Sequence, residues 1–343
     1  MNTNNSMAQH PEHPSDRKKD HIELAFRSQT GILDLDDRFN YEPVLAKHPS
    51  ENQIQAIAFG NKTLSYPIWV SSMTGGTAQA KKINENLALA CREFGLGMGL
   101  GSCRKLIESP ELLPDFDMRE IIGNDLPLYI NLGIAQIEQW FSQSKQDLIK
   151  KLIDTLRADG LIIHINPMQE FMQAEGDRFK YPPLDSIKKV LDAYSFPVIV
   201  KEVGQGMGPA SLKALLQLPL QAIEFGAFGG TNFALLEMNR KEGSQNLLAS
   251  LAQVGHSAEE MILFCNEIAT ANDIACKQVI VSGGVRDFLD GYYFISKSRI
   301  PALYGQASGF LKHAQGSYDE LRYYMQQQIR GLNLAFSFLK IKD

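Results

Sequence analysis

The stretch that decides the fold of this chain is Leu161-Ile162-Ile163-His164-Ile165-Asn166-Pro167-Met168-Gln169-Glu170. Its first half is apolar and lacks the alternation of a half-exposed strand, which predicts a strand buried on both faces, as in a parallel sheet. Its second half brings an imidazole, two amides and a carboxylate directly after that strand. Since α/β folds carry their chemistry at the carboxyl ends of parallel strands, we expect a buried strand that leads into an active site.

Seven other stretches repeat this pattern, in which a short apolar run ends in small or polar residues. The eight runs lie at residues 68–72, 96–102, 128–133, 161–165, 198–203, 222–226, 279–282 and 302–308. Helical patterns between them are clearest at about residues 78–94, 147–158 and 318–338. Strands that alternate with helices form a parallel sheet, and eight units over about 250 residues predict a (β/α)8 TIM barrel.

An open doubly wound sheet is the structural alternative. Its dinucleotide-binding turn would need the spacing G-x-G-x-x-G, which the glycines at 204, 206 and 208 lack. The segments outside the barrel pattern are a possible strand at residues 53–59 and a long stretch at residues 237–256, which by its length predicts a lid or functional loop.

The composition is that of a globular protein, with 44% hydrophobic and 21% charged residues among 343. The net charge of -5 argues against a nucleic-acid or membrane-surface binder, since such proteins carry a basic excess. The four cysteines form no Cys-x-x-Cys pair, which favours a reducing, cytoplasmic compartment over a zinc site or disulfide framework. No stretch has the roughly 18 consecutive apolar residues of a membrane span.

The start of the chain divides into a tail and a helix. Residues 1–15 are polar, lack the apolar core of a signal peptide and are expected to be disordered. Residues 16–29 predict a helix whose first turn is basic, the opposite of what the helix dipole favours. These basic side chains are either a solvated charge cluster or a binding site for an anion. We expect residues 16–343 to form a single domain.

Two glycine-rich loops follow the last two predicted strands, at Ser282–Arg286 and Gly305–Gly309. TIM barrels bind phosphate at these places, through backbone N–H groups and a short helix N-terminus. Glycines also occur simply because a turn is tight. Two such loops at adjacent strand ends, together with an arginine, favour phosphate binding.

Lys201 stands near the end of a very apolar strand, where a lysine is unfavourable unless it is paired or functional. It can form a Schiff base or place a positive charge beside an electron-rich ring. Asn131, Thr231 and the segment 73–75 add hydrogen bonds and close backbone approach at the same mouth. This set suits a flat, phosphate-tailed cofactor such as FMN, and it equally suits a sugar phosphate.

A second set of residues suits an anionic ligand. Arginine and lysine clamp phosphates, and one carboxylate, Glu170, can share a Mg²⁺ with phosphate oxygens. His164 taken alone is more often a satisfied strand histidine than a ligand. Gln169 cannot titrate, so it is expected to orient substrate or relay a proton to a neighbour. The other members of this set are Arg17, Lys18, His21, Arg104 and Asn166.

These motifs occur together and in this order in the type 2 isopentenyl diphosphate isomerases, which the chain resembles from residue 17 to about 312. The motifs are Arg17-Lys18-Lys19-Asp20-His21, Met73-Thr74-Gly75-Gly76, Gly101-Ser102-Cys103-Arg104, residues 164–170, Lys201-Glu202-Val203-Gly204, Gly229-Gly230-Thr231 and Ser282-Gly283-Gly284-Val285-Arg286. Each is weak singly, and together they are specific.

The resemblance implies a TIM barrel with an N-terminal helical extension that converts isopentenyl diphosphate into dimethylallyl diphosphate. The family uses reduced FMN and Mg²⁺, with NADPH or a similar reductant for the flavin, and is commonly a homo-tetramer or homo-octamer. The reaction is a proton addition and elimination, for which N5 of the reduced flavin is the best acid–base candidate. The implied catalytic residues are Gln169, His164 and Lys201, with the lysine stabilising the anionic reduced flavin.

The resemblance also assigns the binding residues. Glu170 would bind Mg²⁺. The implied substrate-binding residues are Arg17, Lys18, His21, Ser102, Arg104, His164, Asn166 and Gln169. The implied FMN-binding residues are Ser72, Met73, Thr74, Gly75, Ser102, Asn131, Lys201, Thr231, Gly283, Gly284, Arg286, Ala307 and Ser308.

The chain departs from the family pattern at several positions. Cys103 stands where the family usually has glutamine, and Gln306 and Ser308 replace a methionine and a glycine. Residues 224–226 read Glu-Phe-Gly where Asp-Val-Ser is common, and residues 232–233 read Asn-Phe in place of Ser-Trp.

Two other functions compete with isomerisation. A flavin oxidoreductase of the 2-hydroxy-acid oxidase type would use His164 against its substrate, but it leaves Glu170 and the basic N-terminal residues without a role. A non-catalytic phosphate-binding barrel leaves the whole stretch from His164 to Glu170 without one. The fold by itself does not separate these possibilities.

Overall fold

A computed structural model describes His21 and residues 24–50, 54–72, 78–173, 175–240 and 248–342. The chain divides into two compact units, one of Met1–Asn40 with Lys342–Asp343 and one of Tyr41–Ile341. The predicted disordered residues 1–15 lie outside the described residues. Of the predicted helix at 16–29, His21, Leu24 and Ala25 are helical, but residues 26–28 form a turn and a bend, so the predicted end of the helix is too late. The expectation of one domain from residue 16 onward stays a prediction.

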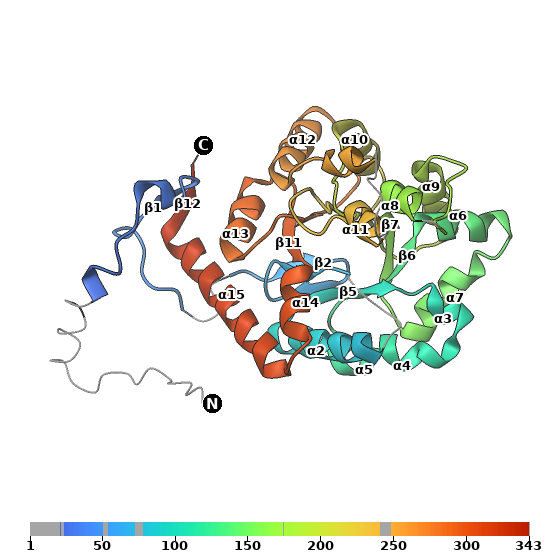
Figure 1. Ribbon diagram of the computed structural model, residues 1–343, viewed down its shortest axis with the longest axis horizontal. Coiled ribbons are helices and arrows are strands. Elements are labelled where there is room, and N and C mark those ends of the chain that lie inside the picture. Colours follow the sequence, from blue (N-terminus) through green and yellow to red (C-terminus); the bar gives the residue numbers. More distant parts are fainter. Residues whose placement is uncertain are drawn as a thin grey trace. The chain divides into compact units, whose positions relative to one another are not determined.

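The second unit is a closed barrel of eight strands, in which each strand pairs in parallel with the next along the chain and the last pairs with the first (Figure 1). This confirms the predicted (β/α)8 barrel, and every predicted apolar run contributes a strand. The strands are β4 (Ile68–Val70), β5 (Gly97–Ser102), β6 (Leu128–Gly133), β7 (Gly160–Ile165), β8 (Val198–Glu202), β9 (Ala222–Glu224), β10 (Val279–Ser282) and β11 (Ala302–Gln306).

Helices follow the strands around the barrel (Figure 1). The predicted helices at 78–94 and 318–338 are confirmed as α2 (Ala78–Phe94) and α15 (Tyr318–Phe338). The remaining helices of eight or more residues are α6 (Ile134–Ser142), α7 (Asp147–Leu156), α9 (Pro183–Ala193), α10 (Pro209–Leu216), α12 (Ala258–Ala271) and α13 (Phe288–Lys297).

The shorter elements complete the chain. Helical segments are η1 (Ile32–Asp34), α3 (Lys105–Glu108), η2 (Pro110–Leu112), α4 (Leu113–Phe116), α5 (Arg119–Ile122), α8 (Pro167–Met172), α11 (Phe233–Asn239), η3 (Ala249–Gln253) and α14 (Ser308–Ala314). Short strands are β1 (Phe39–Tyr41), β2 (Ile57–Phe59), β3 (Lys62–Leu64) and β12 (Leu339–Ile341). In the described part of the chain, no helix is both long and apolar enough to cross a lipid bilayer.

Two predictions outside the barrel pattern need correction. The strand expected at residues 53–59 is shorter than predicted, because β2 covers Ile57–Phe59 alone. It forms an antiparallel hairpin with β3. The loop expected at 237–256 is wrong at both ends, because Glu237 lies in α11 and Ala249–Gln253 form η3. These segments fold because Ala234, Met238 and Ala252 pack with Met172 of α8 in a small apolar cluster. Residues 241–247 lie outside the described residues.

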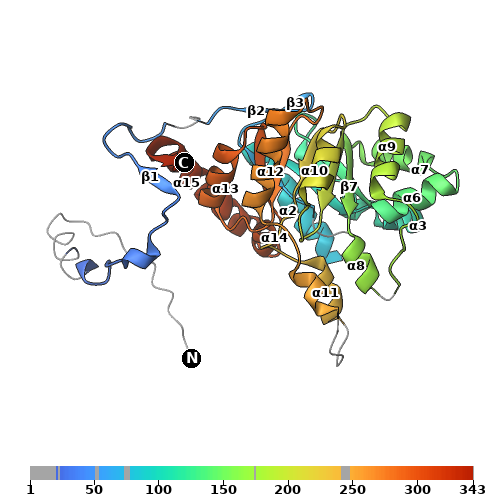
Figure 2. The ribbon, with the colours of Figure 1, turned by 90° about the horizontal axis from the view of Figure 1, so that it is seen from above.

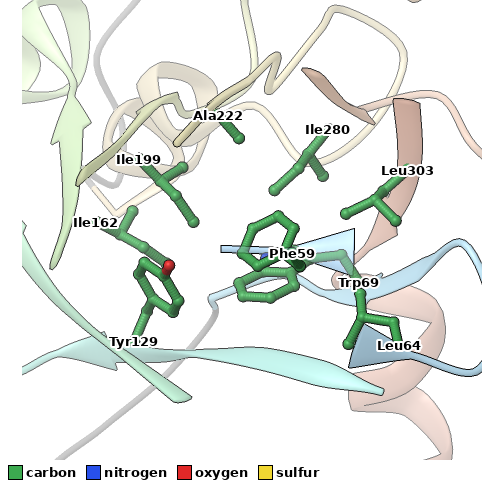
Figure 3. Close-up of a cluster of buried hydrophobic side chains, with 9 residues drawn as sticks. All are labelled: Phe59, Leu64, Trp69, Tyr129, Ile162, Ile199, Ala222, Ile280 and Leu303. Atoms are coloured by element: carbon green, nitrogen blue, oxygen red, sulfur yellow. The ribbon is translucent and has the colours of Figure 1, made fainter. Parts of the chain in front are cut away.

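The first interior layer of the barrel is apolar. Trp69, Tyr129, Ile162, Ile199, Ala222, Ile280 and Leu303 point inward from the strands and pack with Phe59 and Leu64 of the β2–β3 hairpin (Figure 3). Trp69 stacks on Phe59 with ring centroids 5.0 Å apart, and its edge meets Tyr129 at 5.8 Å. The hairpin therefore plugs one end of the barrel with side chains.

The second interior layer is polar. Side chains alternate between the two faces of a strand, so the next inward position lies two residues further on. Those positions are held by Ser71, Asn131, His164, Lys201, Glu224, Ser282 and Gly305. We call this set the polar layer. The strand register places His164, Lys201 and Glu224 side by side on β7, β8 and β9. The polar layer faces the carboxyl ends of the strands, where TIM barrels carry their active sites.

Candidate active site at the carboxyl end of the barrel

A cavity of about 220 Å³ opens above the polar layer, between the ends of β8, β9, β10, β11 and β4. We call it the glycine-rich cavity. Of the predicted FMN-binding residues, those that line it are Ser72, Lys201, Thr231, Gly283, Gly284, Arg286, Ala307 and Ser308. Ser102 and Asn131 do not line it, and Met73, Thr74 and Gly75 lie outside the described residues.

Two loops of this cavity require glycine at specific positions. Gly229, Gly283 and Gly284 have φ values of 113°, 87° and 73°, which side chains rarely adopt. A Cβ on Gly283 would lie 2.1 Å from the Ala227 carbonyl oxygen, and one on Gly230 would lie 3.3 Å from Gly283 Cα. The two loops therefore touch backbone to backbone. Such glycine turns expose N–H groups that form anion-binding concavities.

The floor of the cavity contains two buried serine hydroxyl groups. Ser71 and Ser72 are buried, and no described residue hydrogen-bonds to the hydroxyl of either. Buried polar groups are normally satisfied, so both hydroxyls have capacity for a bound molecule. Together with the glycine loops, they fit a flat polar ring that carries a phosphate.

Arg286 is held at the rim of the cavity by Asp290 in the first turn of α13, the helix that follows it. Its guanidinium donates from Nε to Asp290 Oδ2 at 2.8 Å and from Nη2 to Asp290 Oδ1 at 2.9 Å. Its side chain is 76% exposed, whereas that of Asp290 is 3% exposed. Asp290 therefore sets the direction of Arg286, and this positioning contact was not predicted from the sequence.

His164 and Asn131 form a pair inside the polar layer. His164 Nδ1 lies 2.6 Å from Asn131 Oδ1, and the imidazole has room because position 133 is glycine, where a Cβ would lie 2.9 Å from Nε2. Burial, and next the positive charge of Lys201, lower the pKa of His164 to about 4. His164 is therefore neutral near pH 7, with Nδ1–H donating to the amide oxygen.

Lys201 is paired with protein groups on two sides. Its ammonium donates to the carbonyl oxygen of Glu202 at 3.0 Å and lies 3.5 Å from Glu224 Oε1. The Glu202 carboxylate accepts the N–H groups of Gly204, Gln205 and Gly206 at 2.7–2.9 Å. The loop after β8 is thus anchored by Glu202, while Lys201 stays at the floor of the cavity.

A second group of polar residues lies at the start of α8, directly after β7 at the same end of the barrel as the cavity. Asn166 donates through Nδ2 to Gln169 Oε1 and to Glu170 Oε1, both at 3.0 Å. Its own Oδ1 is buried and has no partner among the described residues. Asn166, Gln169 and Glu170 are called the α8 cluster. The pattern Asn-x-x-Gln-Glu brings them together because one turn of helix separates Asn166 from the other two.

Sequence reasoning missed one member of this neighbourhood, Glu237. Gln169 donates through Nε2 to Glu237 Oε1 at 3.2 Å, and Arg240 pairs with both carboxylate oxygens at 3.0 Å. Glu237 is only 4% exposed. Figure 2 shows α8 and α11 together at one end of the barrel. The sequence feature that could have pointed to Glu237 is its carboxylate within the otherwise apolar run from Phe233 to Met238.

Glu170 is a partly satisfied carboxylate. Its Oε1 accepts from Asn166, and its Oε2 accepts the N–H of Asp177 at 2.8 Å. Within the described ranges, no group of three or more His, Cys, Asp or Glu side chains could hold a metal ion. Any metal at Glu170 would therefore take most of its ligands from substrate oxygens and water, which is the arrangement that Mg²⁺ commonly has.

Of the remaining predicted substrate residues, Ser102 and Arg104 are described in the second unit. Arg104 is about half exposed and forms long ion pairs with Asp177 at 3.4 Å and Glu108 at 3.6 Å. Cys103 is buried, donates its thiol to the Gly101 carbonyl oxygen, and has a pKa raised to about 12 by burial. His21 belongs to the first unit. Arg17 and Lys18 lie outside the described residues.

Known proteins resemble the chain both in sequence and in fold. It is 33% identical over 329 residues to the isopentenyl-diphosphate delta-isomerase of Rickettsia africae, covering 93% of this chain and 92% of that protein. It is 30% identical over 339 residues to the protein of that name from Synechocystis, covering 93% and 90%. No family model matches the chain.

Among solved structures, a mandelate oxidase mutant with an FMN adduct matches with a TM-score of 0.53 at 14% identity, covering 96% of this chain and 99% of that one. The flavin-binding domain of baker's yeast flavocytochrome b2 matches with a TM-score of 0.59 at 10% identity, covering 87% and 72%. These identities support the fold alone. By its extended likeness to the named isomerases, on a barrel consistent with the type 2 branch, the chain belongs to the isopentenyl-diphosphate delta-isomerase family.

Proposed function

We propose that this protein converts isopentenyl diphosphate into dimethylallyl diphosphate with the help of reduced FMN and Mg²⁺. The observation that carries the proposal is that the glycine-rich cavity and the α8 cluster lie at the same end of one barrel. The named isomerases among the relatives supply the substrate. The flavoenzymes among the solved structures support a flavin on this barrel.

The glycine-rich cavity is the proposed FMN site. The unpartnered hydroxyls of Ser71 and Ser72 would bond to polar atoms of the ring, and the N–H groups near Gly283 and Gly284 would hold the phosphate. The other predicted FMN residues stay predictions, including Asn131, whose amide oxygen is bonded to His164. When bound, reduced FMN would supply the group that adds and removes protons.

The α8 cluster is the proposed substrate and metal site. Glu170 would share a Mg²⁺ with the diphosphate, because a carboxylate with phosphate oxygens and water is a common magnesium environment. Asn166 has an unused buried oxygen and would bond to a water of the ion. Arg104 would add a flexible positive charge, since its long ion pairs are weak and exposed. The roles of Arg17, Lys18 and His21 stay predictions.

Isomerisation adds a proton to the terminal alkene carbon and removes one from C2. Gln169 does not titrate, but it is held on one side by Asn166 and on the other by Glu237. Its role would be to orient the reacting groups and exclude water. Neutral His164 and positive Lys201 would set the electrostatics beneath them, with Lys201 favouring an anionic reduced ring.

The supporting expectations follow from the same proposal. NADPH or a similar donor would reduce the flavin. The protein would act in the cytoplasm as a homo-tetramer or homo-octamer. Four buried free thiols are compatible with a reducing compartment.

A 2-hydroxy-acid oxidase is the second candidate, because flavoenzymes of that type share the fold. A histidine that takes a proton from its substrate is usually oriented by a carboxylate, which also stabilises the imidazolium that forms. In this protein, however, Asn131 contacts the ring nitrogen of His164, and no carboxylate does so among the described residues. The coupled residues Gln169, Glu237 and Glu170 would also have no role in that chemistry. Isomerisation accounts for more of the site.

The test is an absorption spectrum joined to an assay. The purified protein should be yellow or become so with FMN, and after reduction it should interconvert the two C5 diphosphates in the presence of Mg²⁺, as followed by ¹H NMR. Oxidation of lactate and mandelate by the same sample is the control reaction. A protein that stays colourless and inactive after FMN is added, or that oxidises a 2-hydroxy acid instead, contradicts the proposal.

A further inference from the structure

Glu224 is a buried carboxylate that the proposed reaction does not use. It is 0% exposed, and neither of its oxygens accepts a hydrogen bond from a described residue. It stands on β9 in the polar layer, beside Lys201 in the strand register.

A buried carboxylate is strongly unfavourable unless a positive charge compensates it. For Glu224 that charge is Lys201, whose Nζ lies 3.5 Å from Oε1. The same ammonium donates to the Glu202 carbonyl oxygen at 3.0 Å and lines the glycine-rich cavity. Lys201 is therefore held between two acceptors on the protein side while it faces the cavity on the other side.

We propose that Glu224 is a positioning residue that holds Lys201 at the cavity floor and offsets its charge. It thereby limits how much more tightly the cavity binds reduced FMN than oxidised FMN. The inference rests on the proposed function, because it requires FMN in this cavity. Reduction adds two electrons and one proton to the neutral ring and leaves it anionic, so a nearby negative charge opposes it and a positive charge favours it.

The experiment measures the midpoint potential of FMN-loaded protein by equilibration with a reference dye, and the affinity for oxidised FMN by fluorescence titration. Glu224→Gln should increase the preference for reduced over oxidised FMN about tenfold, which raises the potential of a two-electron couple by about 30 mV. Glu224→Asp keeps the charge and should return most of the shift. A Glu224→Gln protein with wild-type potential overturns the inference, as does a Glu224→Asp protein that matches Glu224→Gln.

Removal of one partner of a buried ion pair can prevent folding, whereas replacement of both by neutral groups is often tolerated. Lys201→Met removes the positive charge that favours the anionic reduced ring and should lower the midpoint potential. The double variant Lys201→Met with Glu224→Gln should have a midpoint potential near the wild-type value. If the Glu224→Gln protein does not fold, the inference is tested by comparing the midpoint potential of Lys201→Met with that of the double variant. Equal potentials for Lys201→Met and the double variant overturn the inference.

A matched control breaks a carboxylate–cation pair at the other end of the barrel. Asp159 precedes β7 and contacts Lys62 at 2.5 Å and Arg119 at 2.8 Å. Asp159→Asn should lower the stability and leave the midpoint potential unchanged. If the midpoint potential of Asp159→Asn shifts as that of Glu224→Gln does, the shift reflects lost stability, and the proposed role of Glu224 is contradicted. If the wild-type protein binds no FMN, the proposed function itself fails, which is a different outcome from FMN binding with an unchanged potential.

Discussion

The two interior layers of the barrel come from the same strands, two residues apart, and differ completely in character. The layer around Trp69 and Tyr129 is apolar and closed by the β2–β3 hairpin. The polar layer contains an imidazole, an ammonium and a carboxylate in adjacent register. Apolar burial stabilises the fold, whereas buried polar groups oppose it unless they are paired. The lower layer therefore carries stability and the upper one carries chemistry.

The largest expected effect concerns the apolar layer. Trp69→Ala removes a fully buried ring that stacks on Phe59 and meets Tyr129, and it should lower the free energy of unfolding by about 3–5 kcal/mol. Urea denaturation measures the change. FMN affinity measured well below the melting temperature should stay within a few-fold, and a comparable loss of both would mean that the layers are not separate.

Glu237→Gln, near the polar layer, should lower the activity and leave the stability almost unchanged, the reverse of Trp69→Ala. It replaces the anionic acceptor of the Gln169 amide with a neutral one, and kcat should fall about 100-fold, equivalent to about 2.7 kcal/mol in the barrier. The melting temperature should change little.

Arg240→Met is the matched control, since Arg240 is an exposed partner of the same carboxylate. Its effect on kcat should be less than about threefold, because the Arg240 guanidinium is itself 64% exposed and takes no part in the contact of Glu237 with Gln169. Equal losses in the two variants would show that the ion pair, and not the contact with Gln169, matters.

The titration of His164 makes the stability contribution of the polar layer depend on pH. Its folded pKa of about 4 lies below the ordinary value of 6.5, so the unfolded chain takes up the proton first as the pH falls. The associated stability is present above about pH 6.5 and is lost as the pH falls towards about 4. Between pH 7 and 5, His164→Gln should lose roughly 1–2 kcal/mol less unfolding free energy than the wild type.

Chemical denaturation at the two pH values measures this difference. His313→Gln serves as the control, since His313 lies on α14 outside the polar layer and stacks on Tyr324. An identical pH dependence in His164→Gln and the wild type would contradict the assignment of a depressed pKa to His164.

The smallest expected effect concerns the metal. Glu170→Gln should raise the Mg²⁺ concentration for half-maximal activity about tenfold, because it removes a charged ligand, and should leave the FMN content unchanged. Absorbance at the flavin band and a Mg²⁺ titration of the assay measure both. Parallel loss of flavin and activity would indicate a folding defect. Asp177→Asn, which keeps the backbone N–H that Glu170 accepts, should change the Mg²⁺ requirement much less.

The barrel could be predicted from the sequence because its signals are local. Every strand is a short apolar run, and α2 and α15 have clear helical periodicity. Segments that depend on partners far away in the chain were not predictable in the same way. The β2–β3 hairpin is short and finds its place only against the closed barrel, and α11 becomes a helix where its apolar side packs against α8 and η3.

The fold class, the family and many residues at the barrel mouth follow from the amino-acid sequence, because strand ends and glycine-rich loops are contiguous motifs. Which of these residues contact one another follows from the packing of the folded chain. The contact of Lys201 with Glu224 depends on strand register, and that of Gln169 with Glu237 depends on the packing of α8 against α11. Electrostatic interaction depends on distance and burial, and neither is encoded in the spacing of residues along the chain.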